Sequence, residues 1–281
     1  MRSPWRRTEH ETGPIQVVDL ADRYLGSYLV CLEDWSSEMN DAGDHKARWY
    51  EQARTQGLRV KLAVDANDQP IGMIQYVPIE LSPADGEDLY VILCIWVHGY
   101  KKGVGDVQGR GIGTALLEAA EDDVRAIGAK GIAAWGIHLP VWMKASWFKK
   151  HGYKSVDRIG VRELVWKPFV DDAQEPRWIE PKPVDAAETS DVTESDGVNV
   201  TAYISGWCPA ANLVYERARR AAEEFGTEVH FRTVDTSDRA TMIDCGRSDE
   251  VLVNGRPLQR GAPPSYKAVR RKIAREVRRK S

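Results

Sequence analysis

The chain has 281 residues, and at about 100–200 residues per domain this length predicts one large domain or two small ones. Hydrophobic residues make up 42% and charged residues 29% of the chain, which excludes a wholly disordered protein. The net charge of −3 excludes a basic field suited to nucleic acid or to an anionic membrane surface.

The predicted elements of the first part begin with helical spacing over residues 20–33 and 44–56. Residues 58–64 alternate between apolar and polar as a strand does, and a turn leads to a returning strand at 71–81, which predicts a hairpin. Residues 89–97 are nearly all apolar, as in a central strand that is covered on both faces. The later elements are a Gly-rich loop (98–110), a helix (111–128), a strand (130–137), a helix (140–152) and two closing strands (153–158 and 161–167).

The composition changes over residues 169–197, which are rich in Pro, Asp, Glu, Ser and Thr. Such a stretch buries too little apolar surface to offset the entropy of ordering it, so we predict an acidic linker, pinned in places by Trp178. The predicted domains are therefore residues 1–168 and 198–281. The second domain reads as a strand (198–205), a helix (209–226), a strand (228–235), a short helix (238–246), a hairpin with an Asn-Gly turn (250–258) and a basic helix (265–281).

No apolar run approaches the ~18 residues that a membrane span needs. The N-terminus is charged and has no apolar stretch behind it, so a secretory signal is not expected. The four cysteines (Cys31, Cys94, Cys208 and Cys245) show no metal-type spacing. We therefore predict a cytoplasmic protein without a metal site and without a nucleic-acid or membrane partner, and a homodimer stays open.

The Gly-rich turn from Gln108 to Thr114 follows a buried strand and opens a helix. A helix N-terminus presents unpaired N–H groups and partial positive charge, and glycines let an anion approach the backbone, so this turn suits a pyrophosphate. A P-loop would need a Lys before Thr114, and a dinucleotide-binding loop would need an acidic residue at the end of the next strand. Thr114 follows Gly113 and Ile112 instead of a Lys, and the strand ends at Ile137 and His138 without an acidic residue, so the sequence fits neither loop.

The pattern Gln108-x-x-Gly111-x-Gly113, followed by a helix rich in Ala and Leu, resembles motif A of the GCN5-related N-acetyltransferases (GNATs). The stretch from Ala145 to Tyr153, an aromatic pair followed by x-x-x-Gly-aromatic, is similar to the signature of their fourth helix. The resemblance covers about residues 12–168. It implies an α/β (α+β) fold with a mixed sheet and flanking helices, and direct attack of an amine on the thioester of acetyl-CoA.

The resemblance also implies a binding mode for the co-substrate acetyl-CoA. The pantetheine arm would pair with the end of strand 89–97, the diphosphate would bind the amides of the Gly-rich turn, and the thioester would enter a splay between strands 89–97 and 130–137. The implied binding residues are Ile95, Trp96, Val97, Gln108, Gly109, Arg110, Gly111, Ile112, Gly113 and Thr114. Lys101 and Lys102 would contact phosphates or lie on a solvated loop face.

Two positions depart from the family pattern. Phe148 stands where the family usually has a Tyr that protonates the leaving thiolate, and Cys94 stands where a general-base Glu often lies. Three explanations stay open: catalysis by Cys94, His98 or His138; a deprotonated substrate, with thiolate released to water; or binding of acyl-CoA without turnover. Trp135, Trp142 and Trp147 would wall an acceptor pocket or pack in the core.

Residues 198–281 look like a degenerate thioredoxin domain and resemble the YoaP-like domain attached to some bacterial GNATs. Cys208 lies between a strand and a helix, where a helix N-terminus is expected to lower a thiol pKa. Ala211 replaces a second motif cysteine, so general disulfide exchange is not expected, and Cys245 is the remaining candidate for a resolving thiol. The alternative is a scaffold without thiol chemistry that serves docking or substrate capture.

We predict an N-acetyltransferase that acts on an amine of a small-molecule acceptor. The alternatives are a non-catalytic acyl-CoA-binding or regulatory protein, and a thiol-dependent protein that works through Cys208. The basic final helix would dock an acidic partner or form a solvated face.

Overall fold

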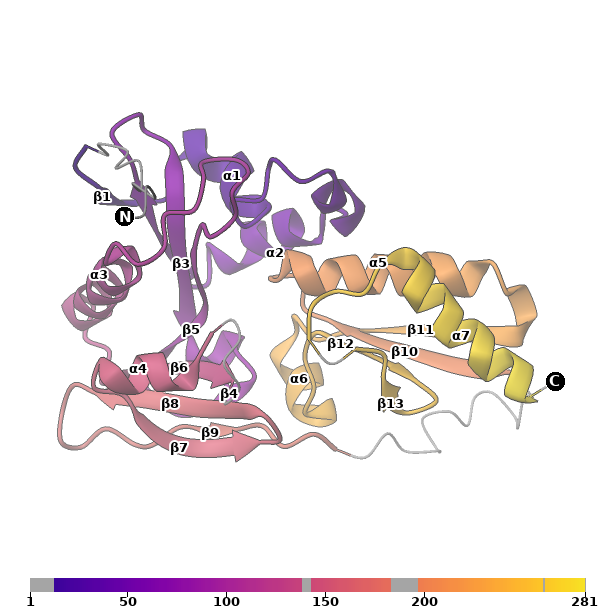
Figure 1. Ribbon diagram of the computed structural model, residues 1–281. Helices are drawn as coiled ribbons and strands as arrows, with labels where there is room; N and C mark the ends of the chain where they lie inside the picture. Colours follow the sequence, from indigo (N-terminus) through magenta and orange to yellow (C-terminus); the bar gives the residue numbers. More distant parts are fainter. Residues whose placement is uncertain (1–12, 138–142, 183–196, 260, 281) are drawn as a thin grey trace, which may run out of the picture.

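The computed structural model describes residues 13–137, 143–182, 197–259 and 261–280, which form two main sheets with separate hydrophobic cores (Figure 1). The first sheet has seven strands in the order β1-β2-β3-β5-β6-β8-β7. Its strands are β1 (Gln16–Asp19), β2 (Arg59–Val64), β3 (Pro70–Pro78), β5 (Leu89–Val97), β6 (Gly131–Ile137), β7 (Lys154–Ile159) and β8 (Arg162–Pro168).

Strand β5 forms the centre of this sheet, as its apolar sequence predicts. It pairs antiparallel with β3 and parallel with β6, and all the other neighbours in the sheet are antiparallel. The sheet is thus mixed, and the predicted bounds of the central strand are those observed.

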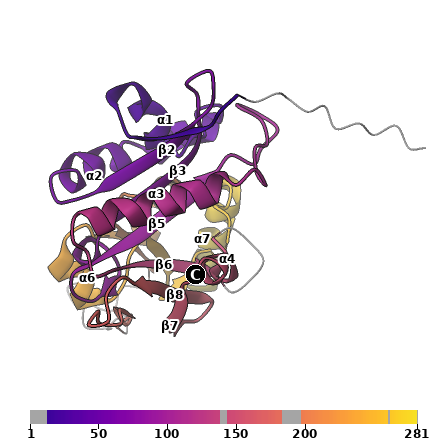
Figure 2. The ribbon, with the colours of Figure 1, turned by 90° about the vertical axis from the view of Figure 1, so that its left-hand side faces the viewer.

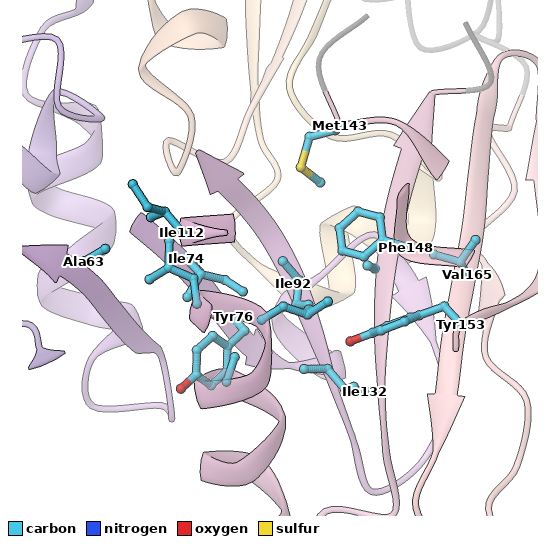
Figure 3. Packing of buried hydrophobic residues seen from close by; sticks show 14 of the residues in the cluster. Ala63, Ile74, Tyr76, Ile92, Ile112, Ile132, Met143, Phe148, Tyr153 and Val165 are labelled. Carbon is cyan, nitrogen blue, oxygen red and sulfur yellow. The ribbon is translucent and has the colours of Figure 1, made fainter. Parts of the chain in front are cut away.

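Helices cover both faces of the first sheet. Successive side chains of each strand point to opposite faces, so each face offers side chains that pack against a helix. Helix α3 (Ile112–Ala126) lies on one face, where its apolar stripe joins the core cluster shown in Figure 3. Helices α1 (Leu25–Leu29) and α2 (His45–Ala53) lie on the other face, as Figures 1 and 2 show. The sheet therefore presents one face to α3 and the opposite face to α1 and α2.

Two predicted helices are shorter in the structure than the sequence suggested. The predicted helix over 20–33 is a 3-10 turn (Asp22–Tyr24) followed by α1, and it ends before Cys31 and Leu32, whose φ angles are +52° and +61°. The predicted helix over 140–152 is α4 (Ala145–Lys150), and residues 138–142 lie outside the described part. A left-handed backbone cannot continue a right-handed helix, which explains the first end.

The second sheet has four strands in the order β11-β10-β12-β13. Strand β10 (Val198–Ile204) is parallel to β11 (Val229–Asp235) and antiparallel to β12 (Glu250–Val253), which pairs with β13 (Arg256–Pro257). Helices α5 (Pro209–Glu223), α6 (Arg239–Cys245) and α7 (Tyr266–Lys280) accompany these strands. Among the helices of the described ranges, none is long and apolar enough to cross a lipid bilayer.

The first part of the predicted linker lies against the first half of the chain. Strand β9 (Arg177–Trp178) pairs with β4 (Ala84–Asp85), and the Trp178 amide donates a hydrogen bond of 2.7 Å to Asp157 Oδ2. Trp178 is buried, so it pins this segment as expected from the sequence. The domain boundaries at residues 168 and 198 remain a prediction.

Candidate acetyl-CoA site

The loop between β5 and α3 folds back on the end of β5. The His98 amide donates to Ile71 O at 3.0 Å, and the Val107 amide donates to His98 O at 3.0 Å. The side-chain amide of Gln108 donates to Val97 O at 3.2 Å. These bonds bring the start of the Gly-rich turn beside the last residue of the central strand.

The Gly-rich turn leaves an open approach to the N-terminus of α3. Gly109 and Gly111 adopt φ angles of +76° and +79°, and a Cβ at either position would meet no atom within 4 Å. Gly111 is the N-cap, and the first hydrogen bond inside the helix runs from the Ala115 amide to Gly111 O at 3.0 Å. The amides of the first turn therefore precede the hydrogen-bonded part of the helix, and their positive end suits a diphosphate.

Strands β5 and β6 part at the level of this turn. Their parallel register runs from Leu89 paired with Gly131 to Ile92 paired with Ala134. Strand β5 then continues to Val97 and β6 to Ile137, and among the described residues no further pair joins the two strands. The register against β3 also shifts here, so that Leu93 forms a bulge. The Trp135 indole N–H donates to Leu93 O at 2.8 Å and holds the strands at the point where they diverge.

Helix α4 closes the site on the α3 side. Trp147 lies 3.4 Å from where a Cβ on Gly113 would stand, and its ring centroid is 4.3 Å from that of His151. His151 Nδ1 donates to Trp147 O at 2.9 Å, because a carbonyl oxygen can only accept, and His151 Nε2 lies 3.0 Å from the Thr114 hydroxyl oxygen. The sequence prediction included Thr114 but missed His151, whose only signal is its place beside Gly152 at the end of the helix.

Phe148 is buried in the hydrophobic core of the first sheet. It is 0% exposed, its ring centroid is 5.4 Å from that of Tyr153, and both belong to the cluster of Figure 3. Its ring has no group that could protonate a thiolate. The departure from the family pattern has a structural reason, because the Phe148 side chain packs in the hydrophobic core.

Cys94 lies on the opposite face of β5, toward α1 and α2. Burial raises the pKa of its thiol well above the usual value, the thiols of Cys31 and Cys208 raise it further, and only Lys46 lowers it. Because a protonated thiol cannot accept a proton, Cys94 does not have the charge state of a general base near neutral pH.

His98 organises the loop. Its side chain is 1% exposed, Nδ1 lies 2.7 Å from Gly105 O, and its ring meets Trp35 and Tyr100 with centroids 6.3 Å and 5.9 Å away. Its catalytic role stays a prediction. Lys102 places its ammonium 5.6 Å from the Trp35 ring, while His138 and Trp142 lie outside the described residues.

The structure corrects the expected pKa of Cys208. Desolvation raises this pKa to about 12, and the backbone amides of Ala211 and Ala210 lower it only in part. The N-terminus of α5 was expected to lower the pKa, but burial has the larger effect. Burial also raises the pKa of Cys245, and all four cysteines are free thiols.

The class of protein follows from these elements and from comparison with known proteins. Residues 18–153, slightly less than half of the chain, match the model of the acetyltransferase (GNAT) family. The match supports this region as a GNAT acetyltransferase domain. The protein is therefore an acyltransferase, and acetyl-CoA is its co-substrate.

Solved structures similar to this chain include a GNAT acetyltransferase from Staphylococcus aureus Mu50 (14% identity, 56% of this chain and 100% of that chain, TM-score 0.43). Another is the PaiA N-acetyltransferase of Thermoplasma acidophilum in complex with coenzyme A (17% identity, 56% of this chain and 99% of that chain, TM-score 0.42). A third is an aminoglycoside 6'-acetyltransferase type Ii (18% identity, 55% of this chain and 97% of that chain, TM-score 0.43). No curated protein matches the chain significantly.

Proposed function

We propose that the protein is an N-acetyltransferase that moves the acetyl group of acetyl-CoA to an amine of a small-molecule acceptor. The observation that carries this proposal is the parting of β5 and β6 directly beside the open N-terminus of α3. On one side of the gap between β5 and β6, the backbone of β5 can hydrogen-bond to a ligand. The N-terminus of α3 can bind a diphosphate through its amides.

The proposed binding residues contact different parts of acetyl-CoA. The backbone from Ile95 to Val97 would pair with the amide groups of the pantetheine arm, because no strand pair joins this segment of β5 to β6 in the part of the chain that the structure describes. The turn from Gln108 to Thr114 would hold the diphosphate, and Gln108 would fix the turn through its bond to Val97 O. The residues of the turn orient the thioester, which is the main requirement of direct transfer.

The reaction needs two proton transfers, removal of a proton from the amine nitrogen and protonation of the leaving thiolate, and neither Cys94 nor Phe148 suits them. Phe148 has no proton to give, and the pKa of Cys94 is raised well above its usual value. We therefore favour attack by a neutral amine on the thioester carbon. The C–N bond forms as the C–S bond breaks, the nitrogen gives its surplus proton to water, and the leaving CoA thiolate takes a proton from water.

We also propose that residues 198–281 form a thioredoxin-like, YoaP-like domain, separated by the linker 169–197 from an acetyltransferase domain at 1–168. The order strand, helix, parallel strand, helix, antiparallel hairpin and helix supports this proposal. The raised pKa of Cys208 favours a scaffold role over thiol exchange.

Two glycines at the ends of α3 offer a matched test. Gly111 and Gly128 both have positive φ (+79° and +86°) and open space around a Cβ, so Leu at either costs about 1–2 kcal/mol of backbone strain. Only Gly111 lies at the proposed diphosphate site. Calorimetry with CoA and acetyl-CoA should show Gly111→Leu weakening binding at least about thirtyfold, and Gly128→Leu less than about threefold.

Turnover separates the proposal from its first alternative. The wild-type protein should release CoA in the presence of a primary amine. Tight binding without amine-dependent release would identify a non-catalytic acyl-CoA-binding protein. The absence of any binding to folded protein would refute the proposed site.

A further inference from the structure

His151, the C-cap of α4, faces the first turn of α3 across a polar contact. Its Nε2 lies 3.0 Å from the hydroxyl oxygen of Thr114, and its Nδ1 donates to Trp147 O at 2.9 Å. The Trp147 ring centroid is 4.3 Å from that of His151, and both His151 and Thr114 are half-buried. Two polar contacts and one aromatic contact therefore fix the imidazole in position.

Thr114 belongs to the proposed diphosphate site. It is the third residue of α3, and its amide precedes the first hydrogen bond inside the helix, which Ala115 donates to Gly111 O. The hydroxyl and the amide belong to the same residue. A phosphate oxygen that is held by the amides of the first turn is therefore close to the Thr114 hydroxyl.

The charge of His151 decides which partner donates in this contact. Nδ1 carries a proton in either charge state, because it donates to a carbonyl oxygen. In a neutral imidazole, Nε2 accepts from the Thr114 hydroxyl and occupies the only proton of that group. In an imidazolium, Nε2–H donates to the hydroxyl oxygen, and the Thr114 proton is available to a third group. Only the imidazolium lets Thr114 donate to an anion at the N-terminus of α3.

The charged side chains around His151 leave room for an anionic ligand to act on it. Those on the turn, on α3 and on α4 with its following residues are Arg110, Glu118, Glu121, Lys144, Lys149, Lys150 and Lys154. Glu121 and Lys149 form ion pairs with other residues, and the rest are exposed, where water and salt screen their charges. Among the residues that the structure describes, no carboxylate forms an ion pair with His151. A bound diphosphate would therefore add a strong negative charge that favours the imidazolium.

We propose that His151 is a positioning residue for the diphosphate of acetyl-CoA, and that it acts through Thr114 as an imidazolium. The inference rests on the proposed acetyl-CoA site and adds a regulation of that site by protons. On binding, Nε2 of the neutral imidazole takes one proton from the solvent, the hydrogen bond to Thr114 reverses, and the Thr114 hydroxyl donates to a phosphate oxygen. Binding is therefore accompanied by proton uptake and strengthens as the pH falls through the range in which imidazole gains its proton.

Calorimetry in buffers with different enthalpies of ionisation measures this uptake, because the buffer supplies every proton that the complex takes up. The probe is dephospho-CoA, which keeps the diphosphate and lacks the 3′-phosphate. A phosphate monoester titrates near pH 6 and would add protons of its own, so it is removed. We expect the wild-type protein to take up at least about 0.3 proton per dephospho-CoA at pH 7, and the Kd to rise about tenfold between pH 6 and pH 8.

Variants at His151 separate its charge from its packing. In His151→Gln the side-chain amide can donate to Thr114 but does not titrate, so binding should stay within about threefold of wild type at pH 6, without proton uptake and without a change of Kd up to pH 8. His151→Leu has no donor and should weaken binding about tenfold at pH 6. The matched control is His230→Gln on β11 of the second half, which should retain the uptake.

Thr114→Val tests the route from His151 to the diphosphate. Val has nearly the shape of Thr and no hydroxyl, so the charge of His151 loses its hydrogen-bonded link to the ligand. The variant should lose most of the proton uptake. Adding His151→Leu to it should weaken binding less than about threefold further, because the two residues act as one unit. If His151→Leu does not fold, the wild type and His151→Gln decide.

The inference and the proposed function fail in different ways. Binding of dephospho-CoA without proton uptake, or an uptake that persists in His151→Gln, would overturn the role of His151 and leave the acetyl-CoA site in place. No binding of CoA or dephospho-CoA to folded wild-type protein would overturn both. Proton uptake that depends on His151, without amine-dependent release of CoA from acetyl-CoA, would support the role of His151 and overturn the proposed transfer.

Discussion

The ionic cluster that anchors α3 gives a quantitative prediction. Asp123 on α3 accepts a 2.7 Å hydrogen bond from Arg59 Nη2 and a 2.5 Å hydrogen bond from the Tyr76 hydroxyl, and Lys61 Nζ lies 3.2 Å away. Desolvation acts to raise the pKa of Asp123, but the bonds from Arg59, Tyr76 and Lys61 outweigh it and lower the pKa to about 2. This carboxylate ties the helix that carries the Gly-rich turn to strands β2 and β3.

The magnitude follows from linkage between protonation and folding. A shift from the ordinary 3.8 to about 2 corresponds to about 2 kcal/mol. Screening lowers this toward about 1 kcal/mol, because the Arg59 side chain is 36% exposed. Since the folded-state pKa lies below the unfolded one, this stabilisation is present above about pH 4 and is lost as the pH falls toward 2.

The assay is urea unfolding followed by tryptophan fluorescence between pH 7 and pH 2.5. Nine of the ten tryptophans precede residue 183, with Trp207 the exception, so the signal reports mainly the first sheet. Asp123→Asn should lower the free energy of unfolding at pH 7 by about 1–2 kcal/mol, and the difference from wild type should shrink as the pH falls. The neighbouring Asp122, 81% exposed, gives the control Asp122→Asn, which should stay within about 0.5 kcal/mol. Equal losses for the two variants, or a difference that does not change with pH, would refute the reasoning.

Two further predictions concern groups that the site does not use as the sequence suggested. Phe148→Tyr should lower the free energy of unfolding by about 1–3 kcal/mol without raising turnover, because it places a hydroxyl at a fully buried position in the core. Phe148→Leu is the control variant. A tenfold gain in kcat for Phe148→Tyr alone, with unchanged stability, would show that the ring reaches the thioester. Because the pKa of Cys208 is about 12, its rate of alkylation should keep rising about tenfold per pH unit from pH 7 to pH 10, and a plateau below pH 8 in a mass-spectrometric time course would contradict this.

The sequence predicted an element well where residues close together in the chain define that element. The apolar run of β5, the stripe of α3 between Gly111 and Gly128, and the Asn-Gly turn at residues 254–255 each predicted an element that the structure contains. The Gly-rich turn also needed no tertiary information, because backbone conformation and the helix N-terminus define it.

Tertiary structure decided the features that depend on residues far apart in the chain. The early end of α1, the pairing of Trp178 with Ala84, and the bond from Thr114 to His151 have no local signal. The pKa of Cys208 depends on how deeply the folded chain buries its thiol, and burial outweighs the helix N-terminus that the sequence did reveal. The sequence by itself thus determined the strand, turn and helix of the candidate acetyl-CoA site, because their geometry is local. Only the folded chain decided the depth of burial of Cys94, Phe148 and Cys208, because burial comes from residues far apart in the sequence.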